Sequence, residues 1–150
     1  GLDHSPLPAG GMTALFVGQT LPPREAPASD RLDYTRMALL LRDPNPIHLD
    51  RVYARERGFR DAVQQGPIQA ARAMQALAGW LDRDWRVRRV SLRFVSNVFP
   101  GDVLTTSGRV VSSSDDEVEI EFEQVNQAGT ATIRGRAKVG PGVRFQPGSR

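Results

Sequence analysis

The sequence predicts an α+β protein in which helices come first and an antiparallel sheet follows. Helical patterns fill residues 29–80, where apolar residues recur along one side of each segment. Four runs between residues 90 and 139 instead alternate apolar and polar residues, as strands with one buried face do. Short turn sequences separate these runs at hairpin-like distances. We therefore expect a single antiparallel sheet that wraps around a slim, long helix.

The first helix is predicted from a capping signal and a proline. Ser29 is a suitable N-cap, and Asp30 and Asp33 in the first turn favour the positive end of the helix dipole. An apolar side follows, until Pro44 stops the helix.

Two further helices are expected before the sheet. A short one over residues 51–57 is closed by Gly58. A longer one begins at Gly66 with Pro67 in its first turn, where proline is tolerated, and runs to Trp80. Alanines at 70, 71, 73, 76 and 78 keep this helix slim, so we expect other elements to pack closely against it.

The strand-like runs cover residues 90–94, 103–111, 117–125 and 130–139. In the third run, four glutamates alternate with apolar residues, so they are expected on a solvated face of the sheet. Basic residues alternate in the same way in the fourth run, and the two sets can pair across the strands. The residues concerned are Glu117, Glu119, Glu121 and Glu123, with Arg134, Arg136 and Lys138.

Length and composition restrict the class of protein. A chain of 150 residues suits one domain, and its net charge of +3 comes from arginines spread along it, which argues against nucleic-acid binding. Without cysteine, disulfides, thiolate catalysis and zinc–thiolate sites are excluded. No apolar run approaches the roughly 18 residues of a membrane span, and no secretory signal is recognisable, so we expect a cytoplasmic protein.

The ends of the chain are expected to lie outside the domain. Residues 1–11 are rich in Gly and Pro and stop before Met12, which suggests a linker or a remnant added to the natural chain. We expect the domain over residues 12–140 and a loose tail over residues 141–150. His4 falls in the first segment and is left out of the search for a site.

One short stretch concentrates residues that can do chemistry. Pro44 and Pro46 force a turn that Asn45 can tie with side-chain hydrogen bonds. Such a turn can hold Asp43 and His48 close enough to share a water molecule, which suits hydration, dehydration or hydrolysis. The plain alternative is a turn-forming aspartate and a structural histidine. A metal site is not expected, because no further ligands converge here.

The stretch "RDPNPIHLDRVYARERGF" resembles the hydratase-2 motif of MaoC-like (R)-specific enoyl-thioester hydratases, G-D-x-N-P-[hydrophobic]-H-x-[DN]. The matching residues are Asp43, Asn45, Pro46, Ile47, His48 and Asp50. Arg42 stands where the motif usually has glycine. Two later segments, "RGFRDAVQQG" and "SLRFVSNVFPGD", are also similar to segments of the family, so the resemblance spans roughly residues 17–139.

The resemblance implies a hot-dog fold, which is an antiparallel sheet around a long central helix, with an additional helical overhang before that helix. It also implies a homodimer joined at the sheet edges, or a higher assembly of such dimers, with an acyl tunnel at the interface. Asp43 and His48 would activate one water for syn addition to a trans-2-enoyl thioester, giving the (R)-3-hydroxyacyl product, or run the dehydration. The backbone N–H of Gly66 would donate to the thioester oxygen. The acyl group would arrive on coenzyme A or phosphopantetheine, with no other cofactor.

The chain departs from the family at the start of the long helix, where Gln65 replaces the usual histidine and Pro67 an apolar residue. Gln65 can be a simple substitute in hydrogen bonding, or a sign of altered substrate or activity. Residues assigned to the tunnel or thioester surroundings are Ile47, Phe59, Gln65 and Met74, although plain core roles suit them too.

Arginines 88, 89 and 93 gather on the first long strand run. Arg88, Arg89 and Arg93 can contact the phosphates of coenzyme A or its carrier equivalent, or simply form a solvated strand face. Two other functions stay open for the chain as a whole. One is a non-catalytic accessory subunit that pairs with a second hot-dog chain in a heterodimeric dehydratase, and the other is a thioesterase.

Overall fold

The computed structural model describes residues 15–142 and confirms the α+β prediction. The expected leader over residues 1–11 and nearly all of the expected tail lie outside the described residues. The elements are β1 (Thr20–Ala26), α1 (Arg31–Leu41), α2 (Pro46–Leu49), α3 (Arg51–Glu56), α4 (Gly66–Trp80), β2 (Trp85–Phe94), β3 (Leu104–Ser113), β4 (Val118–Asn126) and β5 (Ala131–Pro141).

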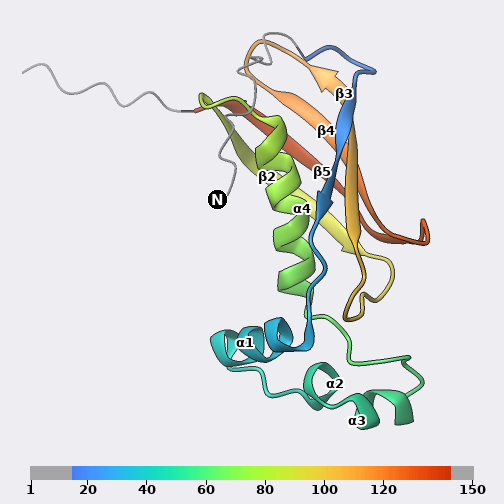
Figure 1. The fold of residues 1–150 in the computed structure, drawn as a ribbon. Coiled ribbons are helices and arrows are strands. Elements are labelled where there is room, and N and C mark those ends of the chain that lie inside the picture. Colours follow the sequence, from blue (N-terminus) through green and yellow to red (C-terminus); the bar gives the residue numbers. More distant parts are fainter. Residues whose placement is uncertain (1–14, 143–150) are drawn as a thin grey trace, which may run out of the picture.

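The five strands form one antiparallel sheet in the order β1-β3-β4-β5-β2 (Figure 1). The four alternating runs correspond to β2, β3, β4 and β5, although β2 begins at Trp85, before the predicted run. The sequence did not predict β1, because Pro22 and Pro23 lie within it. They are accommodated on the edge of the sheet, where the pairing with β3 shifts register between Leu21 and Arg24.

Helix α4 packs along the concave face of the sheet (Figure 1). Most of its buried side chains form one stripe toward the sheet, which carries Gln69, Ala73, Ala76, Leu77 and Trp80. Buried Ile68 packs instead with Tyr34 of α1 and Ala62. The Trp80 ring lies against Gly108 of β3, where an added Cβ would come within 2.8 Å of the ring. A side chain at Gly108 is therefore excluded by the close approach of helix and sheet, as the slim helix predicts.

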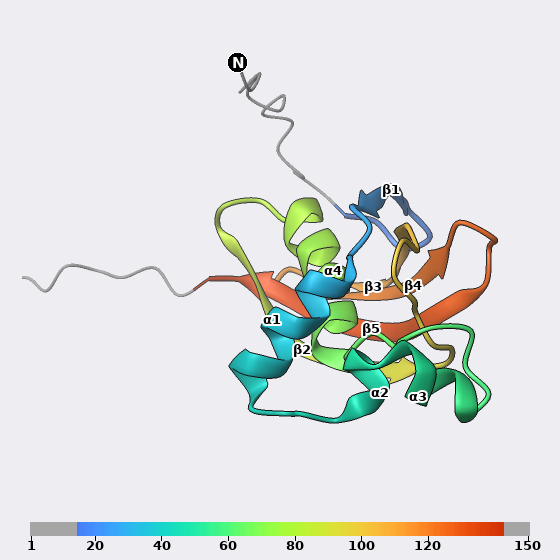
Figure 2. The ribbon, with the colours of Figure 1, turned by 60° about the horizontal axis from the view of Figure 1, so that its bottom comes forward.

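Helices α1, α2 and α3 lie together beyond the N-terminal end of α4 (Figure 2). The prediction that Ser29 caps α1 was wrong. Asp30 is the N-cap, and it exchanges hydrogen bonds with Asp33 in a capping box. Asp50 caps α3 by accepting from the N–H groups of Val52 and Tyr53.

The outer face of the sheet is charged. The predicted pairing of glutamates with basic residues is confirmed: Arg134 bonds Glu123 at 2.7 Å, and Lys138 bonds Glu117 at 2.7 Å. Arg136 lies 3.5 Å from Glu119. Such exposed pairs contribute little stability individually, so this face is mainly a solvated surface. No helix within residues 15–142 has both the length and the apolar character of a membrane span.

Candidate active site

The end of α1 fixes the backbone of Asp43. Arg42 adopts a left-handed conformation with a φ of 52°, the region that glycine tolerates best. The turn brings the Asp43 N–H to the Ala38 carbonyl, 3.0 Å away. The half-buried Asp43 carboxylate then accepts from the Asn45 N–H at 3.2 Å. Because the family motif has glycine where Arg42 stands, the left-handed φ gives a physical reason for that glycine.

A single helical turn presents His48. The sequence predicted only a stiff turn here, but Pro46 begins α2 at a position where its missing N–H is not needed. Asn45 is the N-cap, and its side chain accepts from the Ile47 N–H at 3.1 Å. A four-residue helix is too short to be recognised by periodicity, so the prolines and the asparagine were its only signals.

The hydrogen bond made by His48 determines which ring nitrogen is free. Nδ1 lies 2.7 Å from the Val63 carbonyl oxygen. A carbonyl oxygen can only accept, so Nδ1 carries a proton and Nε2 of the neutral ring is the acceptor. The half-buried ring is thus held in one orientation, with Nε2 able to take a proton from a bound water.

The loop before α4 joins α2 to the end of the sheet. The Val63 N–H donates to the Ile47 carbonyl at 3.0 Å, and the Gln64 N–H donates to the Val98 carbonyl at 2.8 Å. His48 also bonds to Val63. One short, buried segment of the loop therefore links the histidine to the first turn of α4. The geometry brings the predicted catalytic and oxyanion residues to the same end of the molecule.

Gly66 begins α4 with an open N–H. The Ile68 and Gln69 N–H groups bond to the Gln65 carbonyl, at 3.1 and 3.4 Å, while the Gly66 N–H has no acceptor within residues 15–142. The Phe94 ring of β2 lies only 3.2 Å from the position a Cβ on residue 66 would take. A larger residue would therefore displace the ring or block the approach to this N–H.

Buried polar side chains surround this helix end. Gln65 is 2% exposed, and its Nε2 donates to the Tyr34 carbonyl at 2.7 Å, which ties α1 to α4. The Tyr34 hydroxyl faces the Gln64 side chain without a hydrogen bond of normal geometry. Burial, followed by the nearby Asp102 charge, raises the pKa of Tyr34 well above its ordinary value, so the phenol stays protonated.

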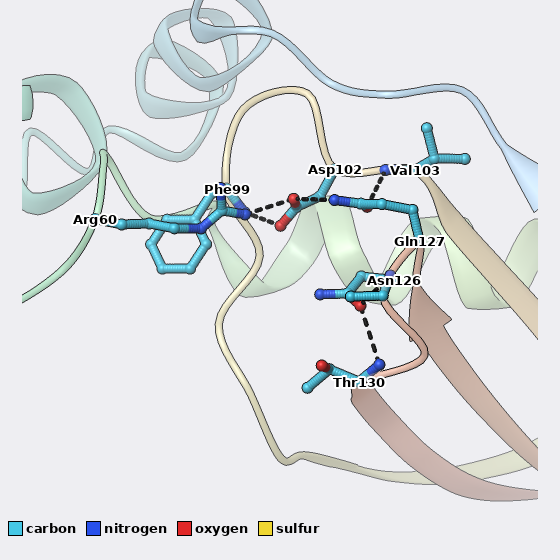
Figure 3. Close-up of polar contacts among 8 residues, drawn as sticks. Arg60, Phe99, Asp102, Val103, Asn126, Gln127 and Thr130 are labelled. Carbon is cyan, nitrogen blue, oxygen red and sulfur yellow. Dashed lines mark hydrogen bonds and ion pairs between the residues drawn. The ribbon is translucent and has the colours of Figure 1, made fainter.

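A cluster of polar side chains on the other side of the loop before α4 fixes the position of that loop (Figure 3). The Asp102 side chain is 2% exposed and accepts from Arg60 at 2.5 Å, from Gln127 Nε2 at 3.0 Å and from the Phe99 N–H at 2.9 Å. The Arg60 guanidinium also lies 4.3 Å from the centroid of the Phe99 ring. Three segments distant in sequence are joined here, a contact that no local pattern in the sequence indicates.

Burial alone would raise the pKa of Asp102. The hydrogen bonds from Gln127, Arg60 and the Phe99 N–H outweigh it and hold that pKa below its ordinary value. Asp102 is therefore a charged anchor for the loop at neutral pH.

The structure places the remaining predicted residues as follows. Ile47 of α2 and Phe59, in the loop after α3, are half-buried, and Met74 packs against the main core cluster, as a plain core role requires. Arg89 and Arg93 are exposed on β2, opposite Lys138 and Arg134 of β5. Arg88 lies in a bulge of β2 and donates to the Pro141 carbonyl at 3.1 Å.

A surface groove lies elsewhere. A groove of about 240 Å³ runs between α1 and α4 and is lined by residues that include Met37, Leu40 and Ile68. Neither Asp43 nor His48 lines it. Within residues 15–142, no cluster of three or more His, Cys, Asp or Glu side chains could hold a metal ion.

The sheet wrapped around α4 defines the chain as a hot-dog fold protein. Residues 17–132 match the model of the MaoC like domain, and the chain therefore belongs to this family. Among curated proteins, none matches the chain.

Solved structures give the same assignment. The R-hydratase PhaJ1 from Pseudomonas aeruginosa, in its unliganded form, has a TM-score of 0.75 and 25% identity, over 91% of this chain and 93% of that one. The (R)-hydratase from A. caviae involved in PHA biosynthesis has a TM-score of 0.73 and 25% identity, over 86% and 98%. The ChsH1-ChsH2 complex from Mycobacterium tuberculosis shares the fold with 21% identity and a TM-score of 0.72, over 84% and 98%.

Proposed function

We propose that the protein is an (R)-specific enoyl-thioester hydratase, or a dehydratase in the reverse direction. The observation that carries this proposal is the His48 Nδ1 hydrogen bond to Val63, which leaves Nε2 as a proton acceptor. Membership of the MaoC-like family and the likeness to two R-hydratases at 25% identity support it.

In the proposed reaction, Asp43 and His48 bind one water between them. As the water oxygen bonds to C3 of a trans-2-enoyl thioester, one of its protons passes to His48 Nε2. The His48 imidazolium then delivers a proton from Nε2 to C2 on the same face, so the double bond becomes a single bond, His48 is neutral again and water is added overall. The reverse sequence removes water from the 3-hydroxyacyl group. Asp43 orients the water and balances the charge of the imidazolium.

Negative charge develops on the thioester oxygen during this reaction. The Gly66 N–H is open and lies at the positive end of the α4 dipole, so it is suited to stabilise that charge. Pro67 leaves this arrangement intact, because an N–H at the second position of a helix has no acceptor within the helix, so its absence in proline breaks no hydrogen bond. Gln65 serves a structural purpose by bonding to Tyr34 in place of the family's histidine.

The test is loss of the enone absorbance when purified protein meets crotonyl-CoA and longer enoyl-CoAs. We expect His48→Ala and Asp43→Asn each to lower the rate by about 10²- to 10⁴-fold, since each removes part of the proton transfer. Wild-type activity equal to that of these variants across CoA and carrier-protein substrates would overturn the proposal. Release of free thiol without a 3-hydroxy product would instead indicate a thioesterase.

Two features of β2 support the remaining proposals about substrate and assembly. Among the described residues, this strand pairs only with β5 and leaves its other edge open, beside exposed Phe94 and Val95. We propose that two sheets join at this edge in a dimer. Arg89 and Arg93 make no ion pair within residues 15–142 and would contact the phosphates of coenzyme A.

A second candidate function is an accessory subunit of a heterodimeric dehydratase. The shared fold of the ChsH1-ChsH2 complex and the altered Gln65-Gly66-Pro67 segment favour it. Retention of both Asp43 and His48 argues against it. Activity that appears only in a stable complex with a second hot-dog chain would support the subunit, and activity of the protein alone would exclude it.

A further inference from the structure

The first turn of α4 offers a single free backbone donor. Pro67 has no N–H, and the Ile68 and Gln69 N–H groups are bonded to the Gln65 carbonyl. Within this turn only the Gly66 N–H is left for a ligand, and the Gln65 N–H just before it also has no acceptor within residues 15–142. A thioester oxygen that gains negative charge is held best by more than one donor. Any second donor from the turn itself must therefore be a side chain.

Gln69 carries a donor without a partner at this position. Its side chain is 3% exposed, and Nε2 has no hydrogen-bond partner within residues 15–142. Burial of an unpaired amide opposes folding, so such a group indicates a purpose other than stability. Gln69 also stands out on the buried stripe of α4, whose next members are Ala73, Ala76 and Leu77.

Helix geometry directs the Gln69 side chain toward the open N–H. The Cα–Cβ bonds of an α-helix tilt toward its N-terminus, so long side chains lie over the preceding turn. For Gln69, that turn begins at Gly66, three residues earlier and on the same face. Helix geometry therefore directs the carboxamide toward the turn that Gly66 begins.

The sheet row that begins next to this turn contains two buried polar side chains. Phe94, whose ring lies against Gly66, begins a cross-strand row that continues through Ile133, Gln124 and Thr106. Gln124 and Thr106 are buried, and their hydrogen bonds are made within the sheet: Gln124 Nε2 lies 3.4 Å from the Thr106 hydroxyl. The sheet thus satisfies its own polar groups, whereas the Gln69 donor stays open.

The other unpaired buried atoms near α4 do not suit the same purpose. Gln64 and Gln65 each have an unpaired side-chain oxygen, which is an acceptor and would repel a negative oxygen. The Tyr34 hydroxyl could donate, but it belongs to α1 and faces Gln64, on the side of the Arg60–Asp102 pair. Gln69 is therefore the side chain that fits.

We propose that Gln69 Nε2 is the second donor to the thioester oxygen, opposite the Gly66 N–H. This inference rests on the proposed function and adds a catalytic residue to it. Gln69 exchanges no proton. Its hydrogen bond becomes shorter and stronger as the oxygen gains charge, so it acts on kcat more than on KM.

The test compares Gln69→Met, which keeps the length of the side chain, with Gln75→Met on the exposed face of the same helix. We expect Gln69→Met to lower kcat for crotonyl-CoA hydration by about 10²-fold, with little change in KM. Its melting temperature should stay level or rise, because an unpaired buried amide is removed. Gln75→Met should leave all three quantities unchanged.

A second readout requires no turnover. Cinnamoyl-CoA bound to a His48→Ala protein should absorb at longer wavelength than free cinnamoyl-CoA, because donors polarise its carbonyl. Adding Gln69→Met should remove much of this red shift, and adding Gln75→Met should not. Gln69→Glu should also lose activity at neutral pH and recover some in acid, where the protonated carboxyl can donate.

The possible outcomes separate the two proposals. An unchanged kcat and an unchanged red shift in Gln69→Met would overturn the role of Gln69 and leave the proposed function intact. A lower melting temperature in both Gln69 variants, with the red shift retained, would show a structural residue and also overturn it. If the wild type neither hydrates nor binds any enoyl thioester, both proposals fall.

Discussion

Replacing Asp102 with alanine is expected to loosen the loop that holds His48. The substitution removes the acceptor of three hydrogen bonds, from Arg60, Gln127 and the Phe99 N–H. The two bonds from neutral donors to a buried charged acceptor contribute about 1.5 kcal/mol each at the lower end of the usual range. Because the Arg60 side chain is 58% exposed, its ion pair adds only about 0.5 kcal/mol. We expect the free energy of unfolding to fall by about 3.5 kcal/mol.

This effect should depend on pH. The folded-state pKa of Asp102 is lower than its unfolded value, so its stabilisation is complete above the unfolded pKa of about 4 and is lost as pH falls through the folded pKa. Urea unfolding of wild type and Asp102→Ala at pH 7 and at pH 3 measures the difference in each condition. The difference in free energy of unfolding between the two proteins should be smaller at pH 3 than at pH 7. An equal difference at both pH values, or none at pH 7, would refute it.

Three further predictions concern stability and substrate binding. Arg42→Gly should raise the free energy of unfolding by about 0.5–1 kcal/mol in urea titrations, because glycine removes the strain of the left-handed φ at some entropic cost; a loss of stability would contradict this. Gly135→Ala should cost about 1–3 kcal/mol, since the new Cβ would come within 2.4 Å of the Phe122 ring, and an unchanged thermal midpoint would show that the ring can move. Arg89→Ala with Arg93→Ala should raise KM for enoyl-CoA in a salt-dependent way and leave kcat unchanged; equal KM values would remove these arginines from the phosphate site.

Much of the sheet could be predicted because its period is visible in the sequence. In β4, glutamates alternate with Val118, Ile120 and Phe122, and this pattern alone fixes which face is buried. Strand β1 was missed because Pro22 and Pro23 are read as a loop. Only their place on a sheet edge, next to a register shift, makes them acceptable.

The candidate site was predictable only in part. Asp43 and His48 follow from a local motif and Gly66 from the family resemblance of a later segment, and the structure brings their surroundings to one end of the molecule. The Arg60–Asp102 pair is separated by 42 residues in sequence, so no pattern could reveal it. Gln69 escaped notice because a polar residue in a helix is usually exposed, and its burial depends on how α4 lies on the sheet.

The central claim is that Asp43 and His48 add water to one face of an enoyl thioester. The most direct measurement is the rate and chirality of the product formed from crotonyl-CoA by wild type and by His48→Ala. We expect wild type to yield (R)-3-hydroxybutyryl-CoA, and His48→Ala to form it about 10²- to 10⁴-fold more slowly. A product of (S) configuration, or equal rates for both proteins, would contradict the account.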